Sequence, residues 1–192
     1  MNLPSINDCF SMIGEMKMMN HIIDHSVMVS NVALCIARSV ELNQPGINIP
    51  LVRTASLLHD ITKTRSFDTG EVHSETGGIL LAAKGFPEIA DIIRQHVILE
   101  DFRSNAPVTE PEIVNYADKR VLHDKVVSLD CRLEYIQVRY GNNPALKFRI
   151  QKMWQDTLAL EKKLFACVDF RPAQLAGHVK PEVNRPAGQD TI

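Results

Sequence analysis

Neither sign of charge is in excess in this sequence. Its 192 residues include 21 Lys and Arg and 23 Asp and Glu, which gives a formal net charge of −2. Duplex nucleic acid and anionic membranes attract strongly basic surfaces, so we expect neither as the main partner. Recognition of a phosphate group must therefore be local, by a few well-placed cations.

Cysteine pairs and long apolar runs are also missing. The Met-rich N-terminal segment is interrupted by Asp8, Glu15 and Lys17, and no small-residue cleavage site follows it. We therefore predict no signal peptide, no transmembrane span and a cytoplasmic location. The cysteines lie far apart and form no CxxC pair, which predicts buried thiols in a reducing compartment. They are Cys9, Cys35, Cys131 and Cys167.

Alternation of apolar and polar residues long enough for a strand is absent, whereas apolar spacings of three and four recur along the chain. This pattern predicts an all-α fold, a bundle of about eight helices. Capping residues, prolines and glycines mark the helix ends. The predicted helices run from Ser5 to Met16, Asn20 to Leu42, Pro50 to Asp60, His73 to Gly85, Pro87 to Val97, Thr109 to Val121, Ser128 to Gly141 and Asn143 to Phe165.

Two segments lack helical periodicity. The stretch Ile61–Glu71 carries Thr, Arg, Ser, Asp and Gly, and we predict a loop there. From Asp169 onward the chain is polar and rich in proline and glycine, which predicts a mobile or loosely docked tail. A composition of 45% hydrophobic and 23% charged residues is typical of globular proteins. We therefore predict one domain over residues 1–168, followed by a polar C-terminal tail over 169–192.

Four predicted helices each direct one metal-competent side chain toward an apolar face. His25, His59, His96 and Asp118 all continue rows of aliphatic residues at spacings of three or four. A buried carboxylate such as Asp118 is costly unless a cation or a hydrogen-bond donor accompanies it. A divalent metal shared with the histidines would supply that partner. On the residues alone, hydrogen-bonded core histidines and a structural ion pair remain the alternative.

The order of these residues resembles a known family. The segment Leu57-Leu58-His59-Asp60-Ile61-Thr62-Lys63 has His25 upstream and Asp118 downstream, and this set resembles the H…HD…D signature of the HD superfamily of metal-dependent phosphohydrolases. The stretch from His73 through Gly85-Phe86-Pro87 to His96 is similar to the central portion of that family. The resemblance covers about Asn20 to Gly141 and implies an HD-type helical bundle.

The resemblance also implies a ligand set. The matching residues in the family hold one metal, and here they are His25, His59, Asp60 and Asp118. In its binuclear branches two more histidines, matched by His73 and His96, hold a second metal that Asp60 bridges. Those branches include hydrolases of symmetric dinucleoside polyphosphates and, more distantly, cyclic-dinucleotide phosphodiesterases, whose Gly-Tyr-Pro motif is missing here. Nitrogen and oxygen ligands suit one or two divalent ions such as Fe, Mn, Ni, Zn or Mg.

We therefore predict a phosphohydrolase that cleaves a phosphoester or phosphoanhydride of a small phosphorylated substrate, a nucleotide or dinucleotide, with metal-activated water. Asp60 and Lys63 are the predicted catalytic residues. Lys63 matches a lysine that contacts substrate phosphate in several of these enzymes, and a solvated loop lysine is its alternative. Arg65, Lys119 and Arg120 are further candidates for binding the substrate.

Two other functions fit the same ligand set. A di-iron HD-fold oxygenase would use the same six residues, and a regulatory module would bind a nucleotide without turnover. The second function is usually accompanied by lost ligands, and none is lost here. His21, His123 and His178 match no position of the family, and we interpret them as surface or capping residues.

Overall fold

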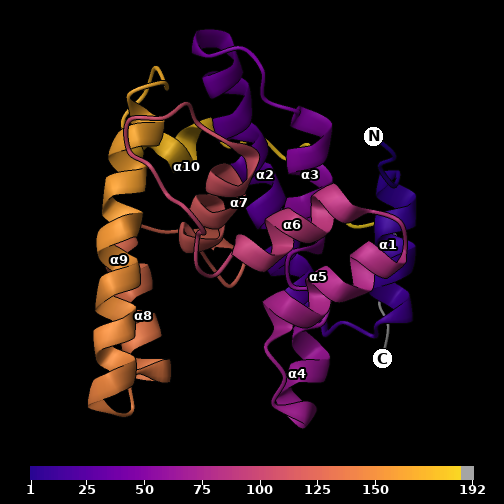
Figure 1. The fold of residues 1–192 in the computed structure, drawn as a ribbon. Coiled ribbons are helices and arrows are strands. Elements are labelled where there is room, and N and C mark those ends of the chain that lie inside the picture. The colour runs from indigo at the N-terminus through magenta and orange to yellow at the C-terminus, as the bar shows by residue number, and fades with distance from the viewer. Residues whose placement is uncertain (187–192) are drawn as a thin grey trace.

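The computed structural model describes residues 1–186, and helices are by far its main secondary structure. The predicted all-α fold is confirmed, with two more short helices than the eight predicted and a minimal two-stranded pair (Figure 1). The elements are α1 (Ile6–Glu15), α2 (Asn20–Asn43), α3 (Ile49–Leu58), α4 (Lys63–Thr69), α5 (His73–Ala83), α6 (Pro87–Gln95), α7 (Glu110–Lys119), β1 (Val121–Leu122), β2 (Lys125–Val126), α8 (Leu129–Tyr140), α9 (Pro144–Phe165), a 3-10 turn (Pro172–Gln174) and α10 (Leu175–His178).

The core of the bundle forms around α2, which packs against α3 and α7, while α5 packs against α6. Val29, Val32, Ile36 and Val40 of α2 are completely buried. Their spacing of three and four places them on one face of the helix. His25 belongs to the same face, so the packing that buries this row also carries its imidazole into the interior.

Side-chain caps set several helix ends, as predicted. The Ser5 side chain accepts a hydrogen bond from the Asp8 amide at the start of α1, and Ser128 and Asn143 cap α8 and α9 in the same way. The capping box predicted at Thr109 is present at the start of α7. The cap predicted at Asn20 is wrong by one residue, because Asn20 already lies inside α2 and Met19 takes the cap position without a side-chain bond.

The loop predicted over Ile61–Glu71 is wrong in its middle, where α4 forms. No α4 residue is buried, so the helix carries no apolar row for a sequence pattern to reveal. Its C-terminal signal is Gly70, which has φ +70° and donates its amide to Ser66 O at 3.0 Å. A glycine in this left-handed conformation is a common helix end.

The helix predicted to reach Val121 instead ends at Lys119, and a tight antiparallel turn follows. Val121 pairs with Val126 and Leu122 with Lys125. His123, in the turn between them, adopts φ +55°. Strands of two residues are too short to show the alternation on which strand prediction depends.

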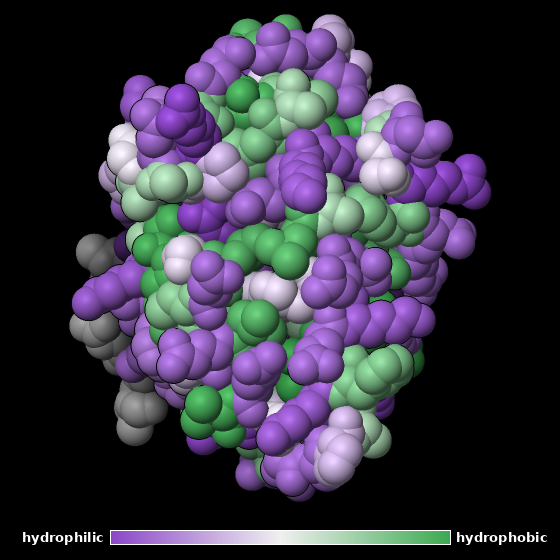
Figure 2. Space-filling view, turned by 90° about the vertical axis from the view of Figure 1, so that its left-hand side faces the viewer, coloured by the Kyte–Doolittle hydropathy of each residue, from purple (hydrophilic) through white to green (hydrophobic). Residues whose placement is uncertain are grey.

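Helices α8 and α9 lie side by side as a hairpin at the left of Figure 1. The C-terminal half of α9 is anchored to α7: Lys163 Nζ lies 2.6 and 2.7 Å from the two carboxylate oxygens of Glu112, and both side chains are buried. The other end of the hairpin is open to solvent, with Val138 at 85% and Phe148 at 68% exposure. The face that α9 presents is mixed, with apolar patches among hydrophilic residues (Figure 2).

Residues 169–186 of the predicted tail lie against the bundle, and 187–192 lie outside the described residues. The Asn31 side chain of α2 accepts hydrogen bonds from the amides of Glu182 and Val183 and donates one to Val183 O. Leu175 and Val183 are buried. This part of the tail is therefore docked through specific contacts, although the division into domain and tail remains a prediction.

The four cysteines differ in burial, whereas the sequence predicted that all four thiols are buried. Cys9 is completely buried, Cys35 and Cys167 are half-buried, and Cys131 is exposed on α8. The prediction of a buried thiol is wrong for Cys131, because the face of α8 that carries it has no partner among the described residues. Across residues 1–186, no helix combines the length and the apolar character that crossing a bilayer requires.

Candidate metal centre

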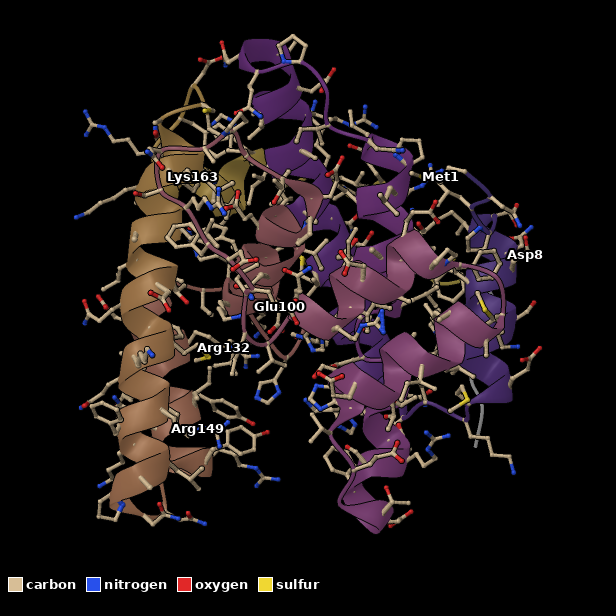
Figure 3. All side chains as sticks on the ribbon, in the orientation of Figure 1. Met1, Asp8, Glu100, Arg132, Arg149 and Lys163 are labelled. Atoms are coloured by element: carbon tan, nitrogen blue, oxygen red, sulfur yellow. The ribbon has the colours of Figure 1, made fainter. Side chains whose placement is uncertain are left out.

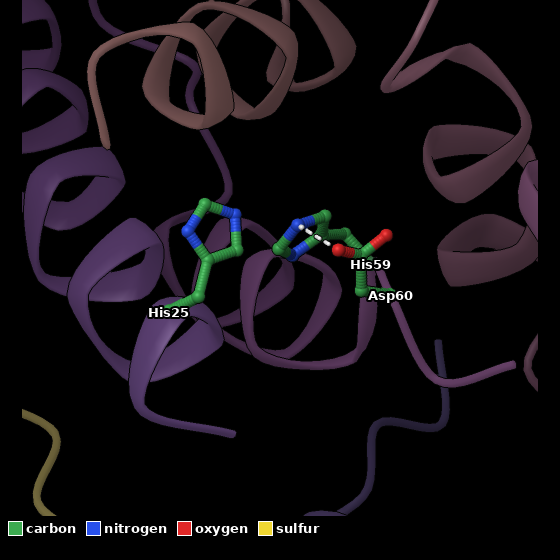
Figure 4. A group of neighbouring side chains, drawn as sticks. All are labelled: His25, His59 and Asp60. Atoms are coloured by element: carbon green, nitrogen blue, oxygen red, sulfur yellow. Dashed lines mark ion pairs between the residues drawn. The ribbon is translucent and has the colours of Figure 1, made fainter. Parts of the chain in front are cut away.

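Six predicted ligands come together where five helices converge. Most of them occupy helix ends: His59 follows the last residue of α3, His73 begins α5, His96 follows α6 and Asp118 lies in the last turn of α7. His25 alone comes from a helix interior. Figure 4 shows His25 of α2 directed toward His59 and Asp60.

The first group joins His25, His59 and the two carboxylates. His25 Nε2 lies 3.1 Å from Asp118 Oδ1. His59 Nε2 lies 3.5 Å from Asp60 Oδ2 and 3.8 Å from Asp118 Oδ1. The ligand atoms of His25, His59 and Asp60 are all within 4.8 Å of one another. This spacing allows a single ion to reach all three.

The second group uses the other oxygen of Asp60. Asp60 Oδ1 lies 3.1 Å from His73 Nε2 and 3.5 Å from His96 Nε2. The two imidazole nitrogens are 3.2 Å apart. Asp60 therefore lies between two nitrogen-rich groups, with Oδ2 near His59 and Oδ1 near His73 and His96.

Backbone carbonyl groups orient three of the imidazoles. His59 Nδ1 lies 2.7 Å from Ser56 O and His96 Nδ1 lies 2.7 Å from Ile93 O, both at a spacing of three residues. His25 Nδ1 lies 2.9 Å from His123 O. A carbonyl oxygen only accepts, so each Nδ1 carries a proton and each ring directs Nε2 to the centre. Carbonyls in the last turns of α3 and α6 are thus used to orient potential ligands.

The unpaired atoms at the centre fit a divalent ion. His59 Nε2 and Asp60 Oδ1 are buried and have no hydrogen-bond partner within residues 1–186. Ligands bound at roughly 2.0–2.2 Å from a metal lie about 3.0–3.6 Å from one another. Four of the five separations, from 3.1 to 3.5 Å, agree with that range, and the 3.8 Å between His59 Nε2 and Asp118 Oδ1 is slightly longer. Imidazole nitrogen and carboxylate oxygen suit Fe, Mn, Zn or Ni.

The protonation states also favour metal binding. Burial lowers the pKa of His59 to about 4, so its imidazole is neutral at pH 7. Burial opposes ionisation of Asp60, but Lys63 and His59 hold the pKa of that carboxyl well below its usual value. For Asp118, the hydrogen bond with His25 and the charge of Arg132 outweigh burial and lower the pKa in the same way. Neutral imidazoles and ionised carboxylates are the forms that bind divalent ions.

Two glycines allow α5 and α6 to bring His73 and His96 together. A Cβ atom at Gly78 would lie 3.0 Å from Ala90 O, and one at Gly77 would lie 3.1 Å from Cγ2 of Ile93. Side chains at these positions would push α5 away from α6. The small residues therefore set the close approach on which the second group depends.

The centre opens into a cavity of about 430 Å³. Of the four cations predicted to bind substrate, Lys63 and Lys119 line this cavity. Lys63 Nζ lies 3.2 Å from His73 Nε2 and 3.6 Å from Asp60 Oδ1. Lys119 Nζ donates to His96 O and Asn115 O, and burial lowers the pKa of Lys119 to about 8. Lys119 therefore supports the turn that carries His96.

Arg65 and Arg120 are not brought to the cavity. The exposed Arg65 donates to Glu71 Oε1 at 2.8 Å on the surface of α4. Arg120 is buried and donates to Val127 O, to the Tyr116 hydroxyl and to Pro172 O. Its guanidinium group is thus engaged in holding the turn after α7 and the chain near Pro172.

Sequence reasoning missed the contribution of α8 and α9. Arg132 comes from the side of α8 that faces the bundle (Figure 3), and its Nη2 lies 3.4 Å from Asp118 Oδ1. Its Nε is buried without a hydrogen-bond partner in the described part of the chain. Ile136 and Tyr140 follow on the same face of α8 and line the cavity with it. The spacing of four between these three residues was the available signal.

The backbone of His123 was also missed, since its carbonyl orients His25. Its ring packs edge-on against Tyr135, with centroids 5.7 Å apart. His178 stacks on Phe170, with centroids 4.0 Å apart, and the exposed His21 lies on the surface of α2. None of these three side chains belongs to either ligand group within residues 1–186.

The fold and this centre define an HD-domain protein. Residues 22–122, more than half of the chain, match the model of the HD domain family, and the chain belongs to that family. The HD superfamily is one of metal-dependent phosphohydrolases, and its members bind divalent metals. The chain is also 28% identical over 141 residues to an uncharacterized protein of Methanocaldococcus jannaschii, an alignment that covers 66% of this chain and 82% of the relative. No solved structure matches the chain.

Proposed function

We propose that this protein is a binuclear metal-dependent phosphohydrolase that cleaves a phosphoester or phosphoanhydride bond of a nucleotide or dinucleotide. The observation that carries the proposal is the position of Asp60, whose two oxygens face two separate groups of imidazoles. The buried Asp60 Oδ1 and His59 Nε2 have no hydrogen-bond partner among residues 1–186. The position of a carboxylate between two nitrogen-rich groups is explained better by a site for two ions than by a structural ion pair.

In this proposal the ligands are His25, His59 and Asp118 for one ion, His73 and His96 for the other, and Asp60 for both. When bound, divalent ions supply an acidified water molecule and neutralise the charge of phosphoryl oxygens. The protein orients three imidazoles through Nδ1–H bonds to backbone carbonyls, which direct Nε2 of each ring toward the centre. The buried site also strengthens electrostatic interactions with a phosphate, because little water screens them.

Lys63 and Arg132 are the cations proposed to bind the phosphate. Both line the cavity, on opposite sides of the ligand groups: Lys63 lies next to His73, and Arg132 lies next to Asp118. A flexible ammonium and a planar guanidinium would stabilise negative charge on different oxygens of the same phosphoryl group. Lys119 contributes through the backbone of His96, since two of its three N–H donors bind the carbonyls of His96 and Asn115.

Metal analysis combined with a phosphatase screen tests this function. Protein purified without chelator should carry up to two divalent ions per chain. It should release inorganic phosphate from nucleotides or cleave dinucleotides in Mn²⁺, Fe²⁺, Ni²⁺ or Mg²⁺. Asp60→Asn retains the size of the side chain but removes its charge, and we expect it to lose both ions and at least 99% of the activity, on the order of the loss of one essential group.

Asp156→Asn is the matched control, because Asp156 is exposed on α9. It should retain metal and activity. Hydrolysis by Asp60→Asn at the parent rate would contradict the proposal. Oxygen consumption by an iron-loaded protein that releases no phosphate would instead favour the di-iron oxygenase, and nucleotide binding without turnover would favour a regulatory module.

A further inference from the structure

The cavity next to the metal centre has a chemically divided lining. Ligand candidates with Lys63 and Arg132 form its charged end, and six mainly apolar residues complete the lining. These are Phe67 of α4, Val97 after α6, Ile136 and Tyr140 of α8, and Ile150 and Met153 of α9. A phosphate bound at the charged end would have its organic part next to this apolar wall.

Helix α8 itself runs from one end of the cavity to the other. Arg132, Ile136 and Tyr140 are four residues apart and share one face of the helix. Arg132 contacts Asp118 at the metal centre, whereas Tyr140 is the last residue of α8. This change from guanidinium to apolar side chains fixes which end of a substrate lies nearest the metals.

Most of this wall lies outside the segment that matches the HD family model. That segment ends at residue 122, and α8 and α9 begin at Leu129 and Pro144. The candidate metal centre and most of the apolar wall are thus provided by different parts of the chain. The match to the HD family therefore does not extend to the hairpin.

The wall offers surface contact with few hydrogen-bonding groups. Tyr140 and Ser66 carry the only side-chain hydroxyl groups of the lining in the described structure, and Ser66 Oγ already donates to Lys63 O at 2.7 Å. Aromatic rings and a methionine sulfur favour a flat aromatic partner. Such a wall recognises the ring surface and distinguishes poorly between rings that differ only in their polar groups.

The cavity volume sets the size of that partner. At about 430 Å³ it falls near the lower end of small-molecule sites, which span roughly 300–1,000 Å³. The space suits one phosphate and one ring system. A second nucleoside of a dinucleotide would have to lie outside it.

We infer that the α8–α9 hairpin selects phosphate compounds that carry one aromatic ring system, and that the ring lies between Phe67 and the Ile136–Met153 side of the wall. The inference rests on the proposed phosphohydrolase function and narrows its substrate class. A nucleotide enters this class through its base, and the wall accepts different bases with similar efficiency. Sugar phosphates and other phosphates without a ring of this kind are poor substrates.

The test compares 1-naphthyl phosphate with ribose 5-phosphate in the Mn²⁺-loaded full chain. We expect kcat/KM for the naphthyl compound to be higher by roughly tenfold or more, the effect of apolar contact in a pocket. Ile136→Ser should lower that ratio roughly tenfold. Ile136→Trp, which fills the cavity, should lower it as well, so a folding defect in one variant does not decide the result. Val138→Ser is the control, because Val138 is 85% exposed on the same helix.

Binding of 1-naphthylmethylphosphonate, which cannot be hydrolysed, gives a readout separate from activity. Its affinity should fall in both Ile136 variants and not in Val138→Ser. Equal kcat/KM for the two substrates, or a ratio and an affinity unchanged in both Ile136 variants, would overturn the inference. If no phosphate is released from any compound but the phosphonate binds through Ile136, the proposed hydrolase function fails while the selection by the wall stands.

Discussion

The helical bundle and the α8–α9 hairpin divide the molecule into a part that holds the candidate metal ligands and a part that faces them. In the bundle, Val29 and Leu57 are completely buried, and all six ligand candidates lie in its helices or directly after them. In the hairpin, Val138 and Phe148 are exposed, and Leu129 is the only buried residue of α8. Precise ligand positions require the packed core, whereas a surface that selects substrates can change without disturbing that core.

This difference predicts that changes in the bundle alter metal content, whereas changes in the hairpin alter the use of substrate. The bundle and the hairpin meet at one pair of side chains in the metal centre, Asp118 and Arg132. Variants in the bundle and variants in the hairpin should therefore separate metal binding from the use of substrate.

The largest effect is expected for a double substitution in the bundle. Replacing His73 and His96 with Ala removes the second ligand group but leaves His25, His59 and Asp118 in place. The variant should fold, keep about half of its metal and lose nearly all turnover, because both ions act on one phosphoryl group. Metal analysis, circular dichroism and phosphate release measure the three properties.

The matched control for that variant is His21→Ala, since His21 is exposed on α2. It should leave metal content and turnover unchanged. A parent protein with one metal per chain, together with a double variant that keeps this metal and its activity, would show that the second group is structural. His73 would then be an ordinary polar residue in the first turn of α5.

A smaller effect is expected for Arg132 in the hairpin. Arg132→Leu removes a cation that we propose contacts phosphate, and KM should rise roughly tenfold, which corresponds to the loss of one charge-assisted hydrogen bond. The metal content should stay close to that of the parent, because the ligand groups of the bundle remain. Steady-state kinetics and metal analysis separate these outcomes.

Arg139→Leu serves as the control for Arg132, because Arg139 is exposed on the same helix and lies outside the cavity lining. If Arg132 acts only through Asp118, Arg132→Leu should instead weaken metal retention and leave KM unchanged. Such a result would remove the proposed division between bundle and hairpin at this position.

The sequence predicted the fold and the candidate ligands where these depend on the spacing of apolar residues and on the order of the motif residues along the chain. The apolar row that contains His25 and the order His25, His59-Asp60, Asp118 predicted both the all-α fold and the set of residues that the structure brings together. These features are visible in the sequence because burial of one helix face requires apolar residues at a regular spacing. The roles of the individual ligands remain predictions.

The parts that could not be predicted depend on contacts between segments distant in sequence. His25 is oriented by the carbonyl of His123, and a carbonyl leaves no trace in residue identity. Arg65 and Arg120 are cations near the motif, yet their partners Glu71 and Val127 engage them away from the cavity. The short helix α4 has no buried residue, so its sequence shows no periodicity.

The smallest functional effect is expected for the thiols, which report the packing of the two parts directly. In the bundle, burial raises the pKa of Cys9 to about 12, so at pH 8 about one thiol in 10⁴ is ionised, and only the thiolate reacts. Cys131 in the hairpin is exposed. Iodoacetamide at pH 8 should therefore alkylate Cys131 and leave Cys9 unmodified until the protein unfolds.

Peptide mass spectrometry measures both sites, and Cys131→Ser should remove the rapidly modified peptide without changing phosphate release. Alkylation of Cys9 at the rate of Cys131 in the folded protein would show that the bundle opens as readily as the hairpin, and the contrast between the two parts would be lost.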